Sequence, residues 1–337
     1  MTFRVPLALA AIAACASVAA ARQAPTFSGT TNTVPVYATV TDKYGRLVPD
    51  LARDEFAVFD NGKPQSLTSF KHEAQPITIV ILVDRSGSVI WTNDLIGAAV
   101  DEFVKNLLPA DKARLGGFSR RIDIAPQEFT NDHDALHEAF ADGRQDAGPT
   151  PLWNAAATAI EALASQEGRR GLLILSDSKD SPDPSDTKIT LAAVTARAQS
   201  DDIAVYAVGL TGQVGKGTMA PPLFQGRGGR GGGGRGGGRG GAGGGSPMGG
   251  PEPWMTSTPD PGLKKLAADS GGEYLELAPM GDVATTFARI ADELHHPYEL
   301  AFSAPALDQK MHTLKVTVRQ ADATARTRSA YLAASGK

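Results

Sequence analysis

An apolar run at residues 77–83, which ends at an aspartate, most restricts how this 337-residue chain folds. Apolar or β-branched residues without a charge, followed by turn residues, are typical of a strand that is buried on both faces. Such a strand belongs inside a parallel sheet that helices cover on both sides. The sequence therefore predicts an α/β domain built around this run.

Turn residues with oxygen-bearing side chains follow this predicted strand directly. The sequence reads Asp-Arg-Ser-Gly-Ser at residues 84–88, so Asp84, Ser86 and Ser88 take alternate positions. Carboxylates and hydroxyls without a nearby His or Cys suit Mg²⁺, Mn²⁺ or Ca²⁺ rather than zinc. The motif by itself is weak, but its position at the end of a buried strand makes these three residues candidate ligands of a divalent cation.

Strands and helices alternate over residues 76–296, which predicts a doubly wound, mostly parallel sheet of six strands flanked by helices. The predicted strands are 77–84, 113–118, 122–129, 171–176, 203–210 and 273–277, and the predicted helices are 95–108, 132–140, 152–164, 191–200, 263–269 and 283–295. In the order 3-2-1-4-5-6, the first and fourth strands are neighbours at the switch point. Asp84 ends the first strand and Asp177 follows the fourth, so we expect both to face one crevice.

Short strands are predicted at both ends of the chain. Residues 30–72 contain strands at 34–40, 56–59 and 67–70, with an Asn-Gly hairpin turn at residues 60–63. Residues 297–334 contain strands at 298–302, 312–318 and 326–332. Because so few strands at each end do not form an independent core, we expect the two ends to pair into one small β-sandwich. Two separate β-flaps on the central domain are the alternative.

The first 21 residues have the pattern of a signal peptide, with Arg4, an apolar stretch and a small-residue cleavage site at residues 19–21. This predicts an exported protein, periplasmic or secreted. The sole cysteine, Cys15, ends a segment that resembles a bacterial lipobox, and its lipidation would anchor the protein to a membrane. We favour cleavage near Ala21, which leaves a mature chain without cysteine and hence without disulfides.

A Gly/Arg-rich tract lies within residues 213–259, between the fifth predicted strand and the next helix. A segment of this composition cannot build a core, so we expect a disordered insert in a loop. Cationic, flexible Arg/Gly tracts also bind RNA, which makes an RNA-associated protein one alternative. With a net charge of −4 and predicted export, we expect no nucleic acid partner.

Together these motifs resemble a von Willebrand factor A-type domain with a metal-ion-dependent adhesion site. Asp84, Ser86 and Ser88 match its first motif, the loop at residues 148–152 resembles the one that supplies a threonine, here Thr150, and the loop at residues 175–177 matches the one that supplies Asp177. The flanking β-segments resemble exported bacterial proteins related to these domains. Ser178 stands where the family often has glycine, which loosens the expected turn but removes no ligand.

The resemblance implies one Mg²⁺ or Mn²⁺ ion, with Ca²⁺ as a further option, held by Asp84, Ser86, Ser88, Thr150 and Asp177. It also implies an open coordination position that a carboxylate of a protein or cell-envelope partner completes. We therefore expect an adhesion-type binding module rather than an enzyme, since no nucleophile motif is evident. A metal-assisted hydrolase, with water in the open position, is the alternative.

Two further features lie close to these motifs. Asp180, Asp183 and Asp186 follow the second aspartate loop in a Ser/Pro-rich stretch, and we expect a solvated acidic loop. Trp153 follows the threonine loop and either lines the crevice or packs beside it.

Overall fold

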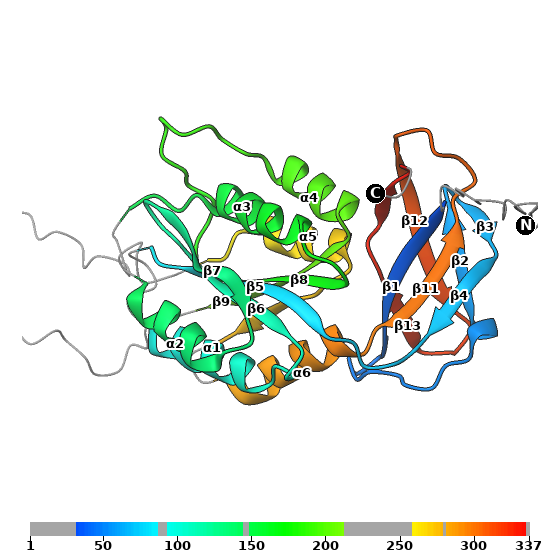
Figure 1. Cartoon of the computed structure of the whole chain (residues 1–337), viewed down its shortest axis with the longest axis horizontal. Helices are drawn as coiled ribbons and strands as arrows, with labels where there is room; N and C mark the ends of the chain where they lie inside the picture. The colour runs from blue at the N-terminus through cyan, green and yellow to red at the C-terminus, as the bar shows by residue number, and fades with distance from the viewer. Residues whose placement is uncertain (1–31, 87–92, 144–147, 212–257, 279–280, 335–337) are drawn as a thin grey trace, which may run out of the picture.

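The computed structural model describes residues 32–86, 93–143, 148–211, 258–278 and 281–334. The chain forms two lobes, an α/β lobe from residues 77–295 and a β-lobe built from the two ends (Figure 1). The predicted signal peptide, Cys15, Ser88 and the Gly/Arg-rich tract lie outside the described residues.

The α/β lobe is organised around a sheet with the strand order β10-β9-β8-β5-β6-β7. The strands are β5 (Ile77–Asp84), β6 (Lys112–Phe118), β7 (Ile122–Thr130), β8 (Arg169–Ser176), β9 (Ile203–Leu210) and β10 (Tyr274–Leu277). All neighbours pair in parallel except β7, which pairs antiparallel with β6 at the edge. This is the doubly wound, mostly parallel sheet that the sequence predicts, with the strands before Asp84 and Asp177 adjacent.

Helices cover both faces of this sheet (Figure 1). Three of them, α1 (Asn93–Lys105), α2 (His133–Asp142) and α6 (Val283–His295), pack on one face, and α3 (Leu152–Ala164), α4 (Leu191–Ser200) and α5 (Gly262–Ser270) pack on the other. Along β5, Ile79 and Ile81 contribute to the first core, whereas Val80 and Leu82 contribute to the second. Since neither face of β5 meets water, a charge within the strand would be buried without a partner.

The β-lobe consists of two four-stranded sheets, each with strands from both ends of the chain. One has the order β13-β1-β11-β4, with β1 (Thr33–Asp42), β4 (Leu67–Lys71), β11 (Tyr298–Ser303) and β13 (Ala323–Arg326). The other has the order β14-β12-β2-β3, with β2 (Phe56–Asp60), β3 (Lys63–Gln65), β12 (Met311–Val318) and β14 (Ala330–Leu332). Val36, Leu300 and Val316, from both ends of the chain, share one apolar cluster.

The strand expected at residues 326–332 is wrong as a single element. The structure has two short strands there, β13 and β14, and they belong to different sheets. Arg328 lies in the break, where its Nη1 donates to the carbonyl of Gln199 (3.0 Å) and its Nη2 to that of Pro35 (2.8 Å). Arg328 thus connects the break both to β1 of the first sheet and to α4 of the α/β lobe.

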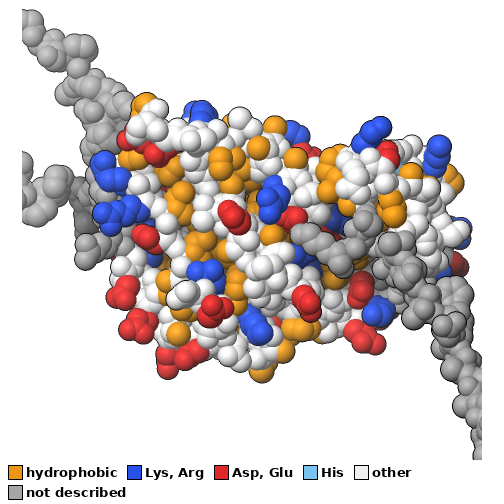
Figure 2. All heavy atoms as spheres, turned by 45° about the horizontal axis from the view of Figure 1, so that its top comes forward, with side chains coloured by type: hydrophobic (Ala, Val, Ile, Leu, Met, Phe, Trp, Pro, Cys, Tyr) orange, Lys and Arg blue, Asp and Glu red, His pale blue; other side chains and the backbone are white. Residues whose placement is uncertain are grey.

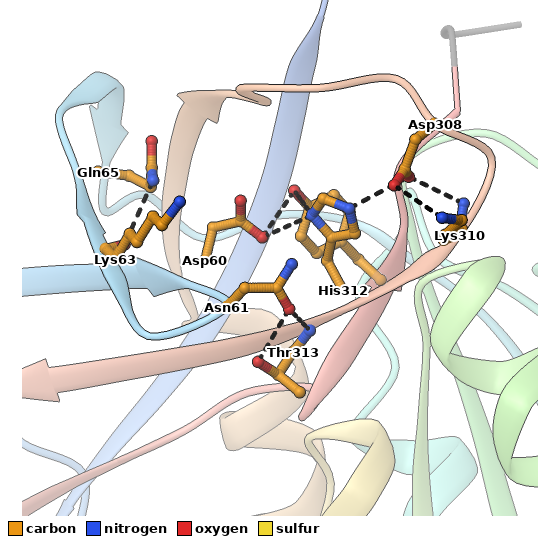
Figure 3. A network of polar contacts seen from close by, with 9 residues as sticks. Asp60, Asn61, Lys63, Gln65, Asp308, Lys310, His312 and Thr313 are labelled. Atoms are coloured by element: carbon orange, nitrogen blue, oxygen red, sulfur yellow. Dashed lines mark hydrogen bonds and ion pairs between the residues drawn. The ribbon is translucent and has the colours of Figure 1, made fainter.

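The hairpin turn predicted at residues 60–63 is present, but its returning strand is β3, whereas the strand expected at 67–70 is β4 of the other sheet. Asn61 and Gly62 both have positive φ, 46° and 77°, as a tight hairpin turn requires. A buried polar network holds the end of β2 (Figure 3). His312 Nδ1 lies 2.8 Å from Asp60 Oδ1, and the Tyr331 hydroxyl donates to the same oxygen at 3.2 Å. The hairpin is therefore tied to β12 and β14 by side chains as well as by backbone.

The β-lobe meets the amino ends of the parallel strands, so their carboxyl ends lie at the opposite end of the molecule (Figure 1). Helix α6 leads directly into β11, and the Gln75 backbone N–H, just before β5, donates to the carbonyl of His295 (2.9 Å). Within the described ranges, no helix has both the length and the apolar character that a membrane crossing requires.

Candidate metal centre

The two predicted aspartates lie at the carboxyl ends of neighbouring strands. Asp84 is the last residue of β5, and Asp177 directly follows β8. Both are buried, with 0% and 1% of their surface exposed. Ser86, two residues after Asp84, is also buried, whereas Ser88 lies outside the described residues. The register of β5 and β8, with Val83 opposite Leu175, places the two aspartate loops side by side.

Serine hydroxyls join these two loops. The Ser178 hydroxyl donates to Asp177 Oδ1 (2.7 Å) and lies 3.3 Å from the Ser86 hydroxyl. The Ser86 backbone N–H in turn donates to Asp84 Oδ1 (2.9 Å). A chain of polar contacts thus runs from one carboxylate to the other. Ser178, which the sequence marks as a departure from the family pattern, is part of this connection.

The Asp84 carboxylate is held from both sides by hydrogen bonds. Besides the Ser86 N–H, the Ser176 hydroxyl donates to Asp84 Oδ2 at 2.6 Å. Burial raises the pKa of Asp84, the hydrogen bonds from Ser176 and Ser86 oppose that shift, and the charge of Asp177 adds to it. No ion pair joins Asp84 to a Lys, Arg or His of the described residues. A cation between Asp84 and Asp177 would balance this buried negative charge.

Thr150 lies on a third loop that is paired with the second. Its backbone N–H donates to the carbonyl of Ser181, and the Ser181 N–H donates to the carbonyl of Thr150, both at 2.8 Å. Thr150 is buried, and helix α3 begins two residues later. The loop that follows Asp177 therefore holds Thr150 at the same end of the sheet as the two aspartates.

Asp180 is not the solvated residue that the sequence predicts. Its side chain is 7% exposed, and its carboxylate accepts a hydrogen bond from the Trp153 N–H (3.3 Å). The Asp180 N–H donates to Asp260 Oδ2 (3.0 Å), and the Asp260 N–H donates to the carbonyl of Ser178 (3.1 Å). Asp180 and Asp260 thus connect the threonine loop, the second aspartate loop and the start of α5. Trp153 packs in the core, as one of its two interpretations predicts.

The donor set fits a hard cation. Across the described part of the chain, no three His, Cys, Asp or Glu side chains group as metal ligands, so this candidate depends on hydroxyls as well as carboxylates. Asp84, Ser86, Thr150 and Asp177 offer only oxygen atoms, which suits Mg²⁺, Mn²⁺ or Ca²⁺. Two carboxylates would balance the charge of one divalent ion.

Sequence reasoning missed Ser176 and Asp260 as residues of this site. Ser176 directly precedes Asp177 in the second motif, but a search for ligands overlooks a hydroxyl that orients another ligand. Asp260 belongs to the start of α5, and its Oδ1 accepts from the Gly262 N–H (2.8 Å) as its Oδ2 accepts from Asp180. Only the folded chain shows that this residue reaches the aspartate loop.

No family model matches the sequence, and no curated protein matches it. Solved structures similar to the chain include von Willebrand factor A-type proteins. One is a von Willebrand factor type A protein from Catenulispora acidiphila, with 12% identity, 92% of this chain and 74% of that chain covered, and a TM-score of 0.48. Another is the conserved hypothetical protein BatB from Bacteroides thetaiotaomicron, with 15% identity and a TM-score of 0.45. That match covers 65% of this chain and 98% of the other chain.

A third similar structure is the vWF domain of the type V pili tip protein Mfa5 from Porphyromonas gingivalis. Its identity is 11%, the match covers 65% of this chain and 95% of that chain, and the TM-score is 0.42. The strand order of this chain, rather than these similarities, defines its fold.

Proposed function

We propose that this chain is an exported, non-enzymatic binding module that captures a carboxylate of a protein or cell-envelope partner through a divalent cation. The supporting observation is that two buried carboxylates end neighbouring strands and are connected through serine hydroxyls. The proposed ligands are Asp84, Ser86, Ser88, Thr150 and Asp177, and the proposed ion is Mg²⁺ or Mn²⁺.

The bound ion would supply a positively charged position that accepts an oxygen of the partner. The chain's own residues hold that position in place. Ser176 fixes Asp84, Ser178 fixes Asp177, and the paired backbones of Thr150 and Ser181 fix the third loop. Since the three loops are held by hydrogen bonds to one another, the site is organised before a partner arrives.

This proposal can be tested with a glycine peptide that carries one glutamate. The full chain is mixed with less than one equivalent of Mn²⁺, and line broadening of the glutamate side-chain protons is followed by NMR. We expect broadening that EDTA and excess Mg²⁺ remove, and none for a peptide with glutamine in place of glutamate. Asp84→Ala should abolish the broadening.

Asp186→Ala is the matched control, because Asp186 is an exposed aspartate of the neighbouring loop. This variant should broaden the glutamate signals as the unmodified chain does. Equal broadening of the glutamine peptide, or full broadening with Asp84→Ala, would contradict the proposal.

A further inference from the structure

A pocket of about 620 Å³ lies beside the candidate metal centre. Its walls come from β6, β7, α2 and the turn after β5, and its lining includes Arg85, Gly117, Arg120, Arg121, Asp123 and Gly143. Arg85 stands between Asp84 and Ser86 in sequence, so the pocket shares its wall with the first metal-binding loop. Figure 2 shows Lys and Arg side chains gathered at the left end of the α/β lobe, where the parallel strands end.

The pocket also borders the threonine loop. A Cβ atom added to Gly148 would lie 3.4 Å from the Cβ of Arg120, so this arginine packs against the backbone two residues before Thr150. A partner held at the metal would thus have its neighbouring residues above the pocket. The pocket and the candidate metal centre therefore share the turn after β5 and adjoin the same threonine loop.

Arg85 is a buried cation whose hydrogen bonding is incomplete. The residue is 5% exposed, its Nη2 donates to the carbonyl of Phe140 (2.7 Å), and its guanidinium lies 4.3 Å from the centre of the Phe140 ring. Among the described residues, its buried Nε has no hydrogen-bond partner, and no carboxylate forms an ion pair with it. A buried guanidinium is normally paired with an anion, so this arrangement points to a ligand.

The backbone around Arg85 is shaped for this side chain. A Cβ atom on Gly143 would lie 2.7 Å from Arg85 Nη2, and one on Gly117 would lie 3.3 Å from its Cγ. The two glycines therefore leave the slot in which the guanidinium lies.

We infer that the Arg85 pocket binds a second carboxylate of the partner whose first carboxylate completes the metal site. This inference rests on the proposed function. The planar guanidinium matches the geometry of a carboxylate. The exposed residues at the pocket carry charges of both signs, since Arg120 and Arg121 are positive whereas Asp123 and Asp142 are negative. Because the two aspartates would repel a polyanion, the pocket is better suited to one compact acidic side chain. The partner therefore presents two acidic side chains within one short segment.

The inference can be tested with glycine peptides that carry two glutamates separated by one to four glycines. Their dissociation constants are measured against the Mn²⁺-loaded full chain and compared with that of the single-glutamate peptide. We expect at least one spacing to bind about 10-fold tighter or more, because a charged pair formed in a buried pocket is strong. Arg85→Lys should reduce that advantage to about 2-fold, the statistical effect of a second carboxylate, since Lys lacks the planar fork.

Two further measurements separate the possible failures. Arg121→Gln changes an exposed residue at the pocket, folds without risk to the core, and should weaken the preferred two-glutamate peptide by about 2- to 5-fold. Mn²⁺ binding by Arg85→Lys, measured by calorimetry, reports whether its metal site is intact. Suppose that the unmodified chain binds Mn²⁺. If no two-glutamate peptide then binds more than about 2-fold tighter than the single-glutamate peptide, or if neither variant weakens the preferred two-glutamate peptide, the inference is wrong while the proposed function stands. If the unmodified chain binds no Mn²⁺, both are wrong.

Discussion

Serine hydroxyls determine how the two buried carboxylates are held. Ser176 is the residue with the clearest positioning role, since it is fully buried and its hydroxyl donates to Asp84 Oδ2 at 2.6 Å. Replacing a residue that orients a metal ligand commonly lowers metal affinity by about 10- to 100-fold. Ser176 is therefore expected to influence the site without contacting the ion.

Replacing Ser176 by alanine tests this role. We expect Mn²⁺ affinity to fall about 10-fold and the free energy of unfolding to fall by about 1–3 kcal/mol, because Asp84 loses a donor in a buried place. Calorimetry and urea unfolding measure the two effects. Ser185→Ala is the control, since Ser185 is exposed and its hydroxyl bonds Asp183 instead. Equal Mn²⁺ affinities in the two variants would contradict the role given to Ser176.

Part of this site could be predicted from sequence, because strand ends and motif residues are local signals. Asp84 and Asp177 could be paired in advance since doubly wound order makes their strands neighbours. The bond between Ser176 and Asp84 could not, because it depends on the register of two strands 92 residues apart. The links through Asp180 and Asp260 depend likewise on loop packing. Ser88 stays a prediction.

Helix bounds were more predictable than the strands of the β-lobe. The observed bounds of α3, α4 and α6 equal those expected from the sequence. Thr190 and Asp282 accept hydrogen bonds from the first turns of α4 and α6, so these starts are set by local chemistry. At the break between β13 and β14, Arg328 instead bonds the carbonyls of Gln199 in α4 and Pro35 in β1. Such a contact between distant segments leaves no periodic pattern in the sequence.

The cap of α6 gives a prediction with a defined pH dependence. Asp282 Oδ1 accepts from the Thr285 N–H (3.0 Å), and its bonds to Thr285 lower the pKa of Asp282. A lowered pKa stabilises the fold above the unfolded pKa, and this stability is lost as pH falls through the folded pKa. Asp282→Ala should therefore lower the midpoint temperature of thermal unfolding at pH 7. The difference in midpoint temperature between this variant and the unmodified chain should shrink as the pH falls.

Asp282→Asn is the conservative control for that helix start. Asparagine also caps helices but carries no charge, so this variant should keep most of the stability and lose the pH dependence that Asp282 contributes. Thermal unfolding between pH 2 and 7 measures both. The role of the charged cap would be refuted if the midpoint temperatures of the unmodified chain and Asp282→Ala differed by the same amount at every pH in this range.

A charged network joins the two lobes of the molecule. Arg326, at the end of β13, contacts Glu273 (2.6 Å) and Glu293 of α6 (2.5 Å). Glu293 is 1% exposed and also pairs with Arg289 (3.0 Å). Burial raises the pKa of Glu293, and Arg326 opposes that shift. The β-lobe thus supplies the counterion of a carboxylate in the helix that closes the α/β lobe, and we expect the two lobes to be coupled in stability.

Removing this arginine should destabilise the whole chain. We expect Arg326→Met to lower the free energy of unfolding by about 3 kcal/mol at pH 7, because it leaves Glu293 buried with one partner fewer. The difference should shrink as pH falls, since protonation removes the charge of Glu293. Urea unfolding at several pH values measures the effect. Arg319→Met, at an exposed position of the β-lobe, is the control and should change little. A matching loss in both variants would argue against the network.

Titration of Mn²⁺ into the full chain by isothermal calorimetry, with Asp84→Ala and Asp186→Ala alongside, measures whether these loops hold a divalent cation. We expect one ion bound per chain, no detectable binding by Asp84→Ala and unchanged binding by Asp186→Ala. An absence of heat with the unmodified chain, or full binding without the Asp84 carboxylate, would show that these loops do not hold a divalent cation.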